Sequence, residues 1–569
     1  MKKLLFLTFS ILFYSSAFAL ESNCNAADQR PIELMQAELK RGLKTFKKQK
    51  PPIYYLSYTY TDTTKYDLWV NANGIAEEQP NHQRYLEVSA RAGSEKMDNT
   101  RTLSNGARAD YVRSYGRIPA PEGEDTLAFR RYLWDLTQQA AERAQSDFDR
   151  VYADSQTSAQ RTDNSNDFVF PPKASYCRKQ ELQAMDTVRI REMLIRLSNI
   201  TRGHKEVTGT TFDFSMTQGT RYFVDTVGSQ IVTPFLRIHL SYNFSSRTAD
   251  GAELKRGKTY NVIHEENLPE EQTLRRDMEQ SLRELNELLL APEAEPVTVP
   301  AILKNRAMAV FVHEVLGHRM EGHRQKLESF GKTFTGKIGQ PVTAPFITIV
   351  DDATLPFFND EPLRGFYEYD DEGVQVRPVI LVENGILREF LMSSSPIEGF
   401  AVSNGHGRRQ LGQSPVARMG VTRLIASQTV PYEELEKQLI EEVKRQGKPY
   451  GYVIDDLSGG FTMTGTSLPQ SFKLEPLYVY RIYPDGRKEV VRGADMVGTP
   501  LVSFSKIKAA ADDYAVFNGS CGAESGWVPV SSIAPSVLLE ALEIEKTAKS
   551  PAKPPILPAP MAILKEKKK

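Results

Sequence analysis

A short run of side chains able to bind a metal lies inside an apolar segment. His313, Glu314 and His318 occur within the apolar run that begins at Ala307. Neutral imidazoles hold zinc, and a nearby carboxylate takes a proton from water acidified by the metal. These residue types indicate a zinc hydrolase with Glu314 as the general base. A histidine on an apolar helix is also often a satisfied core residue, so the motif alone leaves that alternative open.

The spacing of the two histidines departs from the common zinc motif. In H-E-x-x-H the histidines are four residues apart and share one face of a helix. Here His313 and His318 are five residues apart, which would turn their rings away from each other by about 140° on a regular helix. Both can face one metal only if the helix loosens or ends between them, and Gly317 is a residue type that permits this. The sequence therefore predicts a helix from about Ala301 that unwinds near Gly317.

Three cysteines, Cys24, Cys177 and Cys521, bear on both the compartment and the site. In an oxidising compartment the economical arrangement is a Cys24–Cys177 disulfide with Cys521 as a thiolate metal ligand. The sequence does not fix that pairing, and a nucleophile paired with a histidine or a buried inert thiol are two other interpretations of Cys521. The glycines around Cys521 predict a tight turn that presents its thiol.

The first residues have the pattern of an export signal. Lys2 and Lys3 precede the apolar stretch Leu4–Tyr14, and Ala17-Phe18-Ala19 is a small-x-small cleavage signal. We therefore expect a signal peptide over residues 1–19, a mature chain that begins near Leu20, and a periplasmic protein. The formal net charge of −1 gives no electrostatic case for nucleic-acid binding. No later run is long and apolar enough to predict a membrane span.

The N-terminal part combines strands and helices. Aromatic and β-branched runs predict strands, whereas Gly- and Pro-free or amphipathic runs predict helices. Strands are expected at Tyr54–Thr61, Tyr85–Arg91, Val207–Met216, Arg221–Asp225 and Phe235–Phe244, and helices at Leu127–Ala153, Met185–Ile200 and Glu270–Ala291. The polar stretch Asp154–Pro172 predicts a loop. The run Phe235–Phe244 alternates between apolar and polar residues and places His239 on the polar face, so His239 is expected at the surface.

The prolines between Pro292 and Pro300 predict the main domain boundary. We expect an N-terminal α+β domain over residues 20–295, with a possible subdomain break near 154–185, and a C-terminal domain over residues 296–545. The C-terminal domain should be mainly antiparallel β around the metal-binding helix, because Asn384-Gly385 and Asp485-Gly486 lie between apolar runs and predict hairpins. One further helix is expected at Pro431–Gly447. The fold class is thus α+β, and the Lys- and Pro-rich tail 546–569 is expected to be disordered.

Four ordered segments of the C-terminal half resemble the TldD/PmbA family of metallopeptidases. They are His313–His318 with Glu321-Gly322, Gly365–Gly373 with Val382–Gly385 and Leu391, Gly405–Arg409 through Pro415, Arg418 and Met419, and Phe517–Gly522. Upstream, Arg221–Asp225 with Gly228-Ser229 resembles a segment of the family's N-terminal domain. His323 and His406 stand where the family pattern suggests an acid and an asparagine.

The resemblance implies a set of ligands and a reaction. The family's metal is held by two histidines and a cysteine, which implies His313, His318 and Cys521 as ligands of one Zn²⁺ per chain, with Glu314 as the base. It also implies hydrolysis of unfolded or peptide substrates by a homodimer or a heterodimer with a paralogue. A non-catalytic scaffold subunit and a zinc amidase acting on cell-wall or modified peptides are the alternatives.

The roles of several neighbours stay open in the sequence. Glu321 is either a carboxylate bonded to a ligand histidine or a surface charge at the end of the helix. Arg408 and Arg409 bind substrate or pair with the cluster Asp370–Glu372. His323 and His406 line the cleft or lie at the surface or in the core.

Overall fold

The computed structural model describes residues 26–104, 118–121, 125–157, 163–178, 183–326, 333–462 and 471–548. The predicted signal peptide, Cys24 and the tail from residue 549 lie outside the described residues. Cys177 is disulfide-bonded.

The first half of the chain is built on one long, curved sheet. Its strands run in the order β3-β2-β1-β6-β7-β5, with β4 beside β2 and β8 beside β7. All pairs are antiparallel except β5 with β7. The strands are β1 (Ile53–Asn71), β2 (Ala76–Ser94), β3 (Met97–Asp98), β4 (Ile118–Pro119), β5 (Ser175–Cys177), β6 (Val207–Asp225), β7 (Gln230–Arg247) and β8 (Glu253–Val262). The predicted strands are confirmed, and Val207–Met216 and Arg221–Asp225 belong to the single strand β6.

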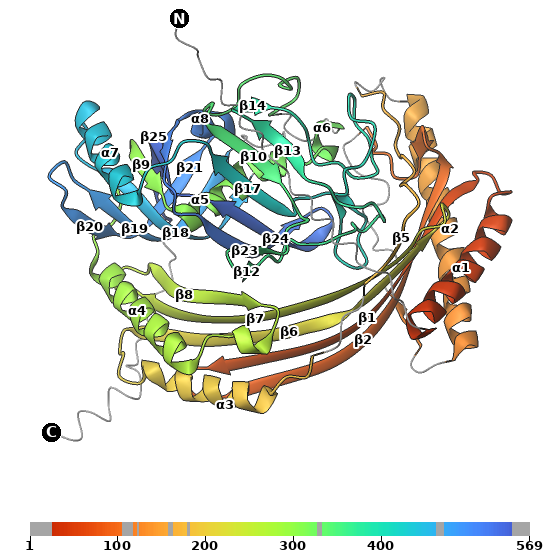
Figure 1. The fold of residues 1–569 in the computed structure, drawn as a ribbon, viewed down its shortest axis with the longest axis horizontal. Coiled ribbons are helices and arrows are strands. Elements are labelled where there is room, and N and C mark those ends of the chain that lie inside the picture. The colour runs from red at the N-terminus through yellow and green to blue at the C-terminus, as the bar shows by residue number, and fades with distance from the viewer. Residues whose placement is uncertain are drawn as a thin grey trace, which may run out of the picture.

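Helices cover the outer face of this sheet (Figure 1). They are α1 (Ala26–Phe46), α2 (Thr126–Thr157), α3 (Thr187–Ser198) and α4 (Glu271–Leu290), with short 3-10 turns at Asn199–Thr201 and Glu265–Asn267. The three predicted helices are confirmed, although α2 continues to Thr157 and takes the first residues of the predicted loop. The first two helices share one core cluster with the sheet, and the other two share a second.

The alternation of side chains along the strands explains this arrangement. On β1 the even-numbered residues, such as Tyr58 and Leu68, are buried against the helices. The odd-numbered residues face the inner side of the curve, because successive side chains of a strand point to opposite faces. His239 lies on this inner face and is partly buried, with Nδ1 3.2 Å from Oδ1 of Asn261. The prediction of a surface histidine was wrong because the C-terminal half packs over the polar face of β7.

The C-terminal half contains two larger sheets. One follows the order β18-β9-β25-β21-β19-β20, with β22 beside β25, and it closes on itself because β18 also pairs with β19. The other has the order β14-β13-β10-β17-β24-β23. Their strands are β9 (Val297–Leu303), β10 (Ile347–Asp351), β13 (Val379–Glu383), β14 (Ile386–Leu387), β17 (Val421–Ala426), β18 (Gly451–Thr462), β19 (Phe472–Ile482), β20 (Lys488–Val491), β21 (Ala494–Gly498), β22 (Ile507–Ala510), β23 (Ala515–Ala523), β24 (Gly526–Ala534) and β25 (Val537–Lys546).

Smaller elements complete this half. Two ribbons pair β11 (Phe357–Phe358) with β12 (Glu361–Pro362) and β15 (Gly407–Arg408) with β16 (Val416–Ala417), and the helices are α5 (Asn305–Phe311), α6 (His323–Lys326), α7 (Tyr432–Arg445) and α8 (Pro500–Ser505). Both predicted hairpins are confirmed: Asn384 and Gly385 have positive φ angles of 49° and 81°, and β19 pairs with β20. The predicted helix at Pro431–Gly447 is α7. The chain is α+β with mainly antiparallel sheets.

The short helix α5 lies in the core between the two C-terminal sheets. It contacts β18 on one side and β23 and β24 on the other. Its residues Ala307–Phe311 are all buried, and a helix that is apolar on every side needs such a setting. Among the described residues, no helix has the length and apolar character that crossing a bilayer requires.

Ion pairs join the inner face of the curved sheet to the C-terminal half. Arg409 pairs with Glu87 of β2 at 3.0 Å, and Arg221 of β6 pairs with Asp371. These contacts fix the position of the second half in the curve of the first.

The packing of α4 gives a direct test of this architecture. Leu285 is buried against the sheet, whereas Leu290 on the same helix is 81% exposed. Leu285→Ala should lower the free energy of unfolding by about 2–5 kcal/mol, because it leaves a cavity in the core. Leu290→Ala should change it by less than about 0.5 kcal/mol. Urea unfolding followed by circular dichroism measures both, and equal losses would contradict this packing.

Candidate metal centre

The segment that carries both histidines begins with a strand rather than a helix. Residues Ala301–Leu303 belong to β9, which pairs with β18 on one side and β25 on the other. The predicted helix start at Ala301 was therefore wrong, and α5 begins at Asn305. The apolar residues of β9 are buried on both faces, and a short buried run of this kind has the same appearance in sequence whether it is strand or helix.

The predicted unwinding before His318 is confirmed. A π turn over Val312–Leu316 follows α5, and a 3-10 turn over Gly317–Arg319 follows the π turn. Residues five apart are brought together along a π turn, because its hydrogen bonds join residues i and i+5. The rings of His313 and His318 accordingly lie close, with centroids 5.2 Å apart and planes at 80°.

Gly317 is needed for space rather than for conformational freedom. Its φ of −53° and ψ of −51° are ordinary helical values. A Cβ at this position would lie 1.9 Å from Sδ of Met419. A side chain at position 317 would therefore force the buried side chain of Met419 to move.

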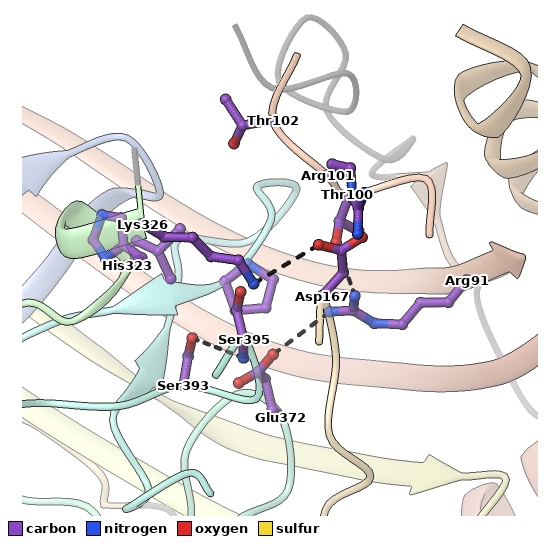
Figure 2. Close-up of a pocket in the computed structure, with 12 residues that line it drawn as sticks. Arg91, Thr100, Arg101, Thr102, Asp167, His323, Lys326, Glu372, Ser393 and Ser395 are labelled. Atoms are coloured by element: carbon purple, nitrogen blue, oxygen red, sulfur yellow. Dashed lines mark hydrogen bonds and ion pairs between the residues drawn. The ribbon is translucent and has the colours of Figure 1, made fainter. Parts of the chain in front are cut away.

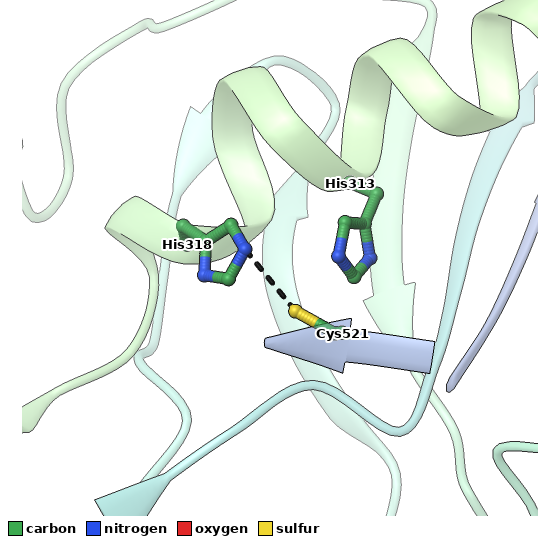
Figure 3. A group of neighbouring side chains, drawn as sticks. All are labelled: His313, His318 and Cys521. Carbon is green, nitrogen blue, oxygen red and sulfur yellow. Dashed lines mark hydrogen bonds between the residues drawn. The ribbon is translucent and has the colours of Figure 1, made fainter. Parts of the chain in front are cut away.

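Cys521 reaches the histidines from a strand of the second sheet (Figure 3). It lies in β23 opposite Val528 of β24, so the predicted tight turn around the thiol was wrong and the hairpin turns after Ala523. Its Sγ is 3.2 Å from Nε2 of His318. One ligand atom from each of His313, His318 and Cys521 lies within 4.8 Å of the others. Tetrahedral zinc with two nitrogens and a sulfur requires separations of about 3.5 Å, so this cluster is close to the needed geometry.

The charges of the cluster favour the ligand form of the thiol. Burial alone would raise the pKa of Cys521, but His318 and His313 hold that pKa well below its ordinary value. Burial would lower the pKa of His318, but Cys521 and Glu321 raise it well above its ordinary value. A thiolate is the form of cysteine that binds metals.

Glu314 projects from the π turn beside the two histidines. Burial raises the pKa of its carboxyl group above the ordinary value, which brings it closer to the range of an efficient general base. Gly460 of β18 makes room for it, because a Cβ there would lie 2.8 Å from Cγ of Glu314.

Glu321 is a buried partner of His318, one of the candidate ligands. Its carboxylate oxygens lie 3.2 and 3.3 Å from Nδ1 of His318, and the side chain is fully buried. Burial would raise its pKa, but His318 and Arg324 lower it to about 2. Of the two interpretations from the sequence, the geometry supports the carboxylate that orients the imidazole.

Two arginines tie this carboxylate to the hairpin that bears Cys521. Arg418, which is completely buried, lies 3.3 Å from Glu321 and donates to the carbonyl oxygen of Cys521 at 2.6 Å. It also donates to Ser525 at the hairpin turn at 2.9 Å. Arg324 donates to Glu321 and to Glu524, both at 2.8 Å. The two arginines therefore link the segments that supply His318 and Cys521.

The other candidate residues from the sequence have separate partners. The side chain of Arg408 donates to the carbonyl oxygens of Met419 and Pro529, and that of Arg409 pairs with Glu87, so neither side chain pairs with the cluster Asp370–Glu372. The prediction that one of these arginines forms an ion pair with the cluster was wrong. Asp371 pairs with Arg221, and from Arg409 it accepts a hydrogen bond of the backbone N–H rather than of the side chain.

Both extra histidines are buried. His406 lies in the core with Nε2 3.2 Å from Asp351, and His323 lies 3.3 Å from Glu524. His323 also lines a polar cavity of about 50 Å³ between the two halves of the chain (Figure 2). There Lys326 faces Asp167 at 3.7 Å and Arg91 faces Glu372 at 3.9 Å, so each cation faces a carboxylate.

Residues 296–546 match the PmbA/TldA metallopeptidase C-terminal domain. A TldD homologue from Haemophilus influenzae, described as a metalloprotease, is 32% identical over 267 residues, which are 46% of this chain and 50% of that protein. The C-terminal half of the chain is thus a domain of the TldD/PmbA type. A metalloprotease from Methanocaldococcus jannaschii is 30% identical over 230 residues, 40% of this chain and 47% of the relative. A zinc metalloprotease TldD homologue from Saccharolobus solfataricus is 26% identical over 253 residues, 43% of this chain and 51% of that protein.

The chain thus spans about half the length of these family members. Solved structures cover more of it. TldE from Thermococcus kodakarensis has a TM-score of 0.59 at 15% identity, with 90% of this chain and 100% of that chain covered. A Thermotoga maritima protein described as a proposed modulator of a DNA gyrase has a TM-score of 0.60 at 17% identity, covering 91% and 100%. At these identities the likeness shows a shared fold.

Sequence reasoning missed part of the surroundings of the candidate site. In the sequence, Arg418 stands out only as part of a segment that resembles the family, and Arg324 and Glu524 match no motif. Arg324 and Glu524 are 200 residues apart in the chain, and no local sequence pattern predicts that they are in contact.

Arg418 joins Glu321 to the backbone of Cys521, and the affinity of the protein for zinc tests whether this contact supports the metal centre. Arg418→Lys and Glu321→Gln should each weaken zinc binding roughly 10- to 100-fold, because partners of metal ligands contribute on this scale. The double variant should lose less than the product of the single losses, since both act through one contact. Competition with a chelating indicator measures the affinity.

Arg388→Lys is the matched control, since Arg388 is a surface residue paired with Glu383. Multiplicative losses in the double variant would show that Arg418 and Glu321 act independently.

Proposed function

We propose that this chain is a zinc-dependent peptidase whose metal is held by His313, His318 and Cys521. The observation that carries the proposal is the approach of the Cys521 thiol to His318, a residue 203 positions away in the chain. The names of the relatives, metalloproteases and one zinc metalloprotease, support the same activity.

The residues present fit a zinc ion. Nδ1 of His313 is buried and has no hydrogen-bond partner among the described residues. Two imidazoles and a thiolate are a typical donor set for zinc, whereas magnesium and calcium prefer oxygen ligands. Three protein ligands also match a catalytic zinc site, which keeps a further position for substrate or water.

The mechanism assigns separate tasks to the residues around the cluster. When bound, zinc supplies a Lewis acid that polarises the scissile carbonyl and acidifies water. Glu314 accepts the proton of the attacking water and passes it to the leaving amine. Glu321 holds Nδ1 of His318 and so fixes which nitrogen of that ring faces the cluster.

The substrates that we propose are peptides or unfolded proteins, and the active form that we propose is a dimer. The shared fold with TldE supports pairing with a second copy or with a paralogue. The intact set of three ligands and Glu314 favours an active subunit over a non-catalytic scaffold.

Two substitutions separate the base from the ligands. Glu314→Gln should keep zinc and lose roughly 10²- to 10⁴-fold in peptide cleavage, because it removes the general base. Cys521→Ser should lose both zinc and cleavage, because it removes the thiolate. Zinc content by mass spectrometry and cleavage of a peptide panel, with muropeptides included, measure these outcomes.

His82→Gln serves as the control, because His82 is exposed and pairs with Asp62. Normal cleavage by Glu314→Gln would show that the base is misassigned. Wild-type protein without zinc and without activity would favour the scaffold, and cleavage of muropeptides alone would favour the amidase.

We also propose export to the periplasm. The basic and apolar start of the sequence supports it, and the disulfide at Cys177 suits an oxidising compartment. N-terminal sequencing of protein from a periplasmic fraction should give a mature chain that starts at Leu20. Full-length protein with Met1, recovered from the cytoplasmic fraction, would contradict export.

A further inference from the structure

Three arginines gather where the curved sheet faces the C-terminal half. We call Arg237, Arg364 and Arg408 the arginine cluster. Arg237 projects from the inner face of β7, Arg364 follows β12, and Arg408 lies on β15. Arg364 reaches the inner face through Asn261 of β8, which pairs with His239, two residues from Arg237 on β7. Arg364 and Arg408 both lie close enough to Arg237 to lower its pKa.

Hydrogen bonds fix the positions of two of these arginines. Arg364 donates through its side chain to Asn261 of β8 at 3.0 Å and through its backbone N–H to Asn518 of β23 at 3.0 Å. Arg408 donates to the carbonyl oxygen of Pro529 on β24 at 2.7 Å. Both arginines thus lie against the hairpin formed by β23 and β24.

None of the three has a carboxylate partner within the part of the chain that the structure describes. Arg237 forms no hydrogen bond and no ion pair among these residues. Its guanidinium carbon lies 5.6 Å from the centroid of the Phe235 ring. Arg364 has a buried Nε without a hydrogen-bond partner. Arg408 bonds only carbonyl oxygens and stacks on Tyr367.

The acid that acts on Arg237, Asp371, already has a partner. The negative charge of Asp371 raises the pKa of Arg237, but Asp371 is paired with Arg221. Arg221 is a fourth cation, and its charge lowers the pKa of Arg237. Burial, then Arg364 and Arg408, lowers the pKa of Arg237 to about 10. Positive charge is therefore in excess in a place where water is partly excluded, and such charge is costly unless it is paired.

We propose that the arginine cluster binds an oxyanion, namely a carboxylate or a phosphate group. The planar guanidinium presents parallel N–H donors that match two oxygens of such a group. An anion between Arg237 and Arg364 would accept hydrogen bonds from the unpartnered donors and reduce the repulsion among the three cations.

This site is distinct from the metal centre. Asn518, which holds Arg364, and Cys521 are three residues apart on β23 and point to opposite faces of the strand. The oxyanion and the zinc would therefore bind on two sides of one strand. The inference goes beyond the proposed peptidase activity and does not depend on it.

Thermal unfolding of the zinc-loaded full chain tests the site. The melting temperature is measured at constant ionic strength while chloride is replaced by inorganic phosphate or by an N-acetylated dipeptide with a free C-terminal carboxylate. The same dipeptide with an amidated C-terminus, which is neutral, is added to the chloride buffer at the same concentration. Wild-type protein should melt at a higher temperature with phosphate or with the free-carboxylate dipeptide. Arg237→Gln and Arg364→Gln should weaken the apparent affinity roughly 10- to 100-fold.

The change in melting temperature caused by Arg237→Gln should also differ in sign from that of a variant that breaks an ion pair. In chloride alone, Arg237→Gln should melt at the same or a higher temperature than wild type, because it removes repulsion. Arg388→Gln, which removes a paired surface arginine, should keep the full response to the anion.

Each outcome supports or overturns the oxyanion site. A response to phosphate alone identifies a free oxyanion, and a response to the free but not the amidated dipeptide identifies a peptide C-terminus; both support the site. The absence of any response in wild type, or an equal response in both cluster variants, overturns it. A lower melting temperature of Arg237→Gln in chloride would make that arginine structural and would also overturn it.

Discussion

The candidate metal centre depends on the contact between an unwound helix end and a strand from the far end of the chain. His313 and His318 come from one segment and Cys521 from another, and all three are buried. Such polar groups are costly in a core unless they have partners. The buried ion pairs among Glu321, Arg418, Arg324 and Glu524 hold the two segments together. An isolated buried ion pair is a weak source of stability, but buried ion pairs can fix one arrangement of segments. Here they hold the candidate ligands in place.

The curved sheet contributes a surface rather than a ligand. Its outer face is apolar and packs on four helices, and its inner face is polar and receives the C-terminal half. Contacts such as Arg409 with Glu87 cross this junction and set the second half in place. The same polar face brings Arg237 opposite Arg364 and Arg408, so charges that are far apart in the sequence are concentrated at one point.

Local patterns predicted most elements well. The stripe of α4, the alternation of β7 and the Asn384-Gly385 hairpin are each set by residues that are near neighbours in the chain, and the structure has all three. The failures share a different cause. Ala301–Leu303 is a strand because β18 and β25 pair with it, and Cys521 lies in a strand because β24 pairs with it. Partners supplied by distant segments decided both cases, and a short apolar or glycine-rich run does not reveal them.

The sequence by itself determined the chemistry that the site can offer. Two imidazoles, a carboxylate and a thiol were visible as residue types, and the five-residue spacing of the histidines already required the helix to unwind. Only the tertiary structure decided which groups meet: the thiol with the imidazoles, Glu321 with Arg418, and Glu87 rather than Asp371 with the side chain of Arg409. The physical reason is that covalent spacing controls geometry over one or two turns of a helix. Contacts across hundreds of residues are set by how sheets and helices pack, which no local pattern encodes.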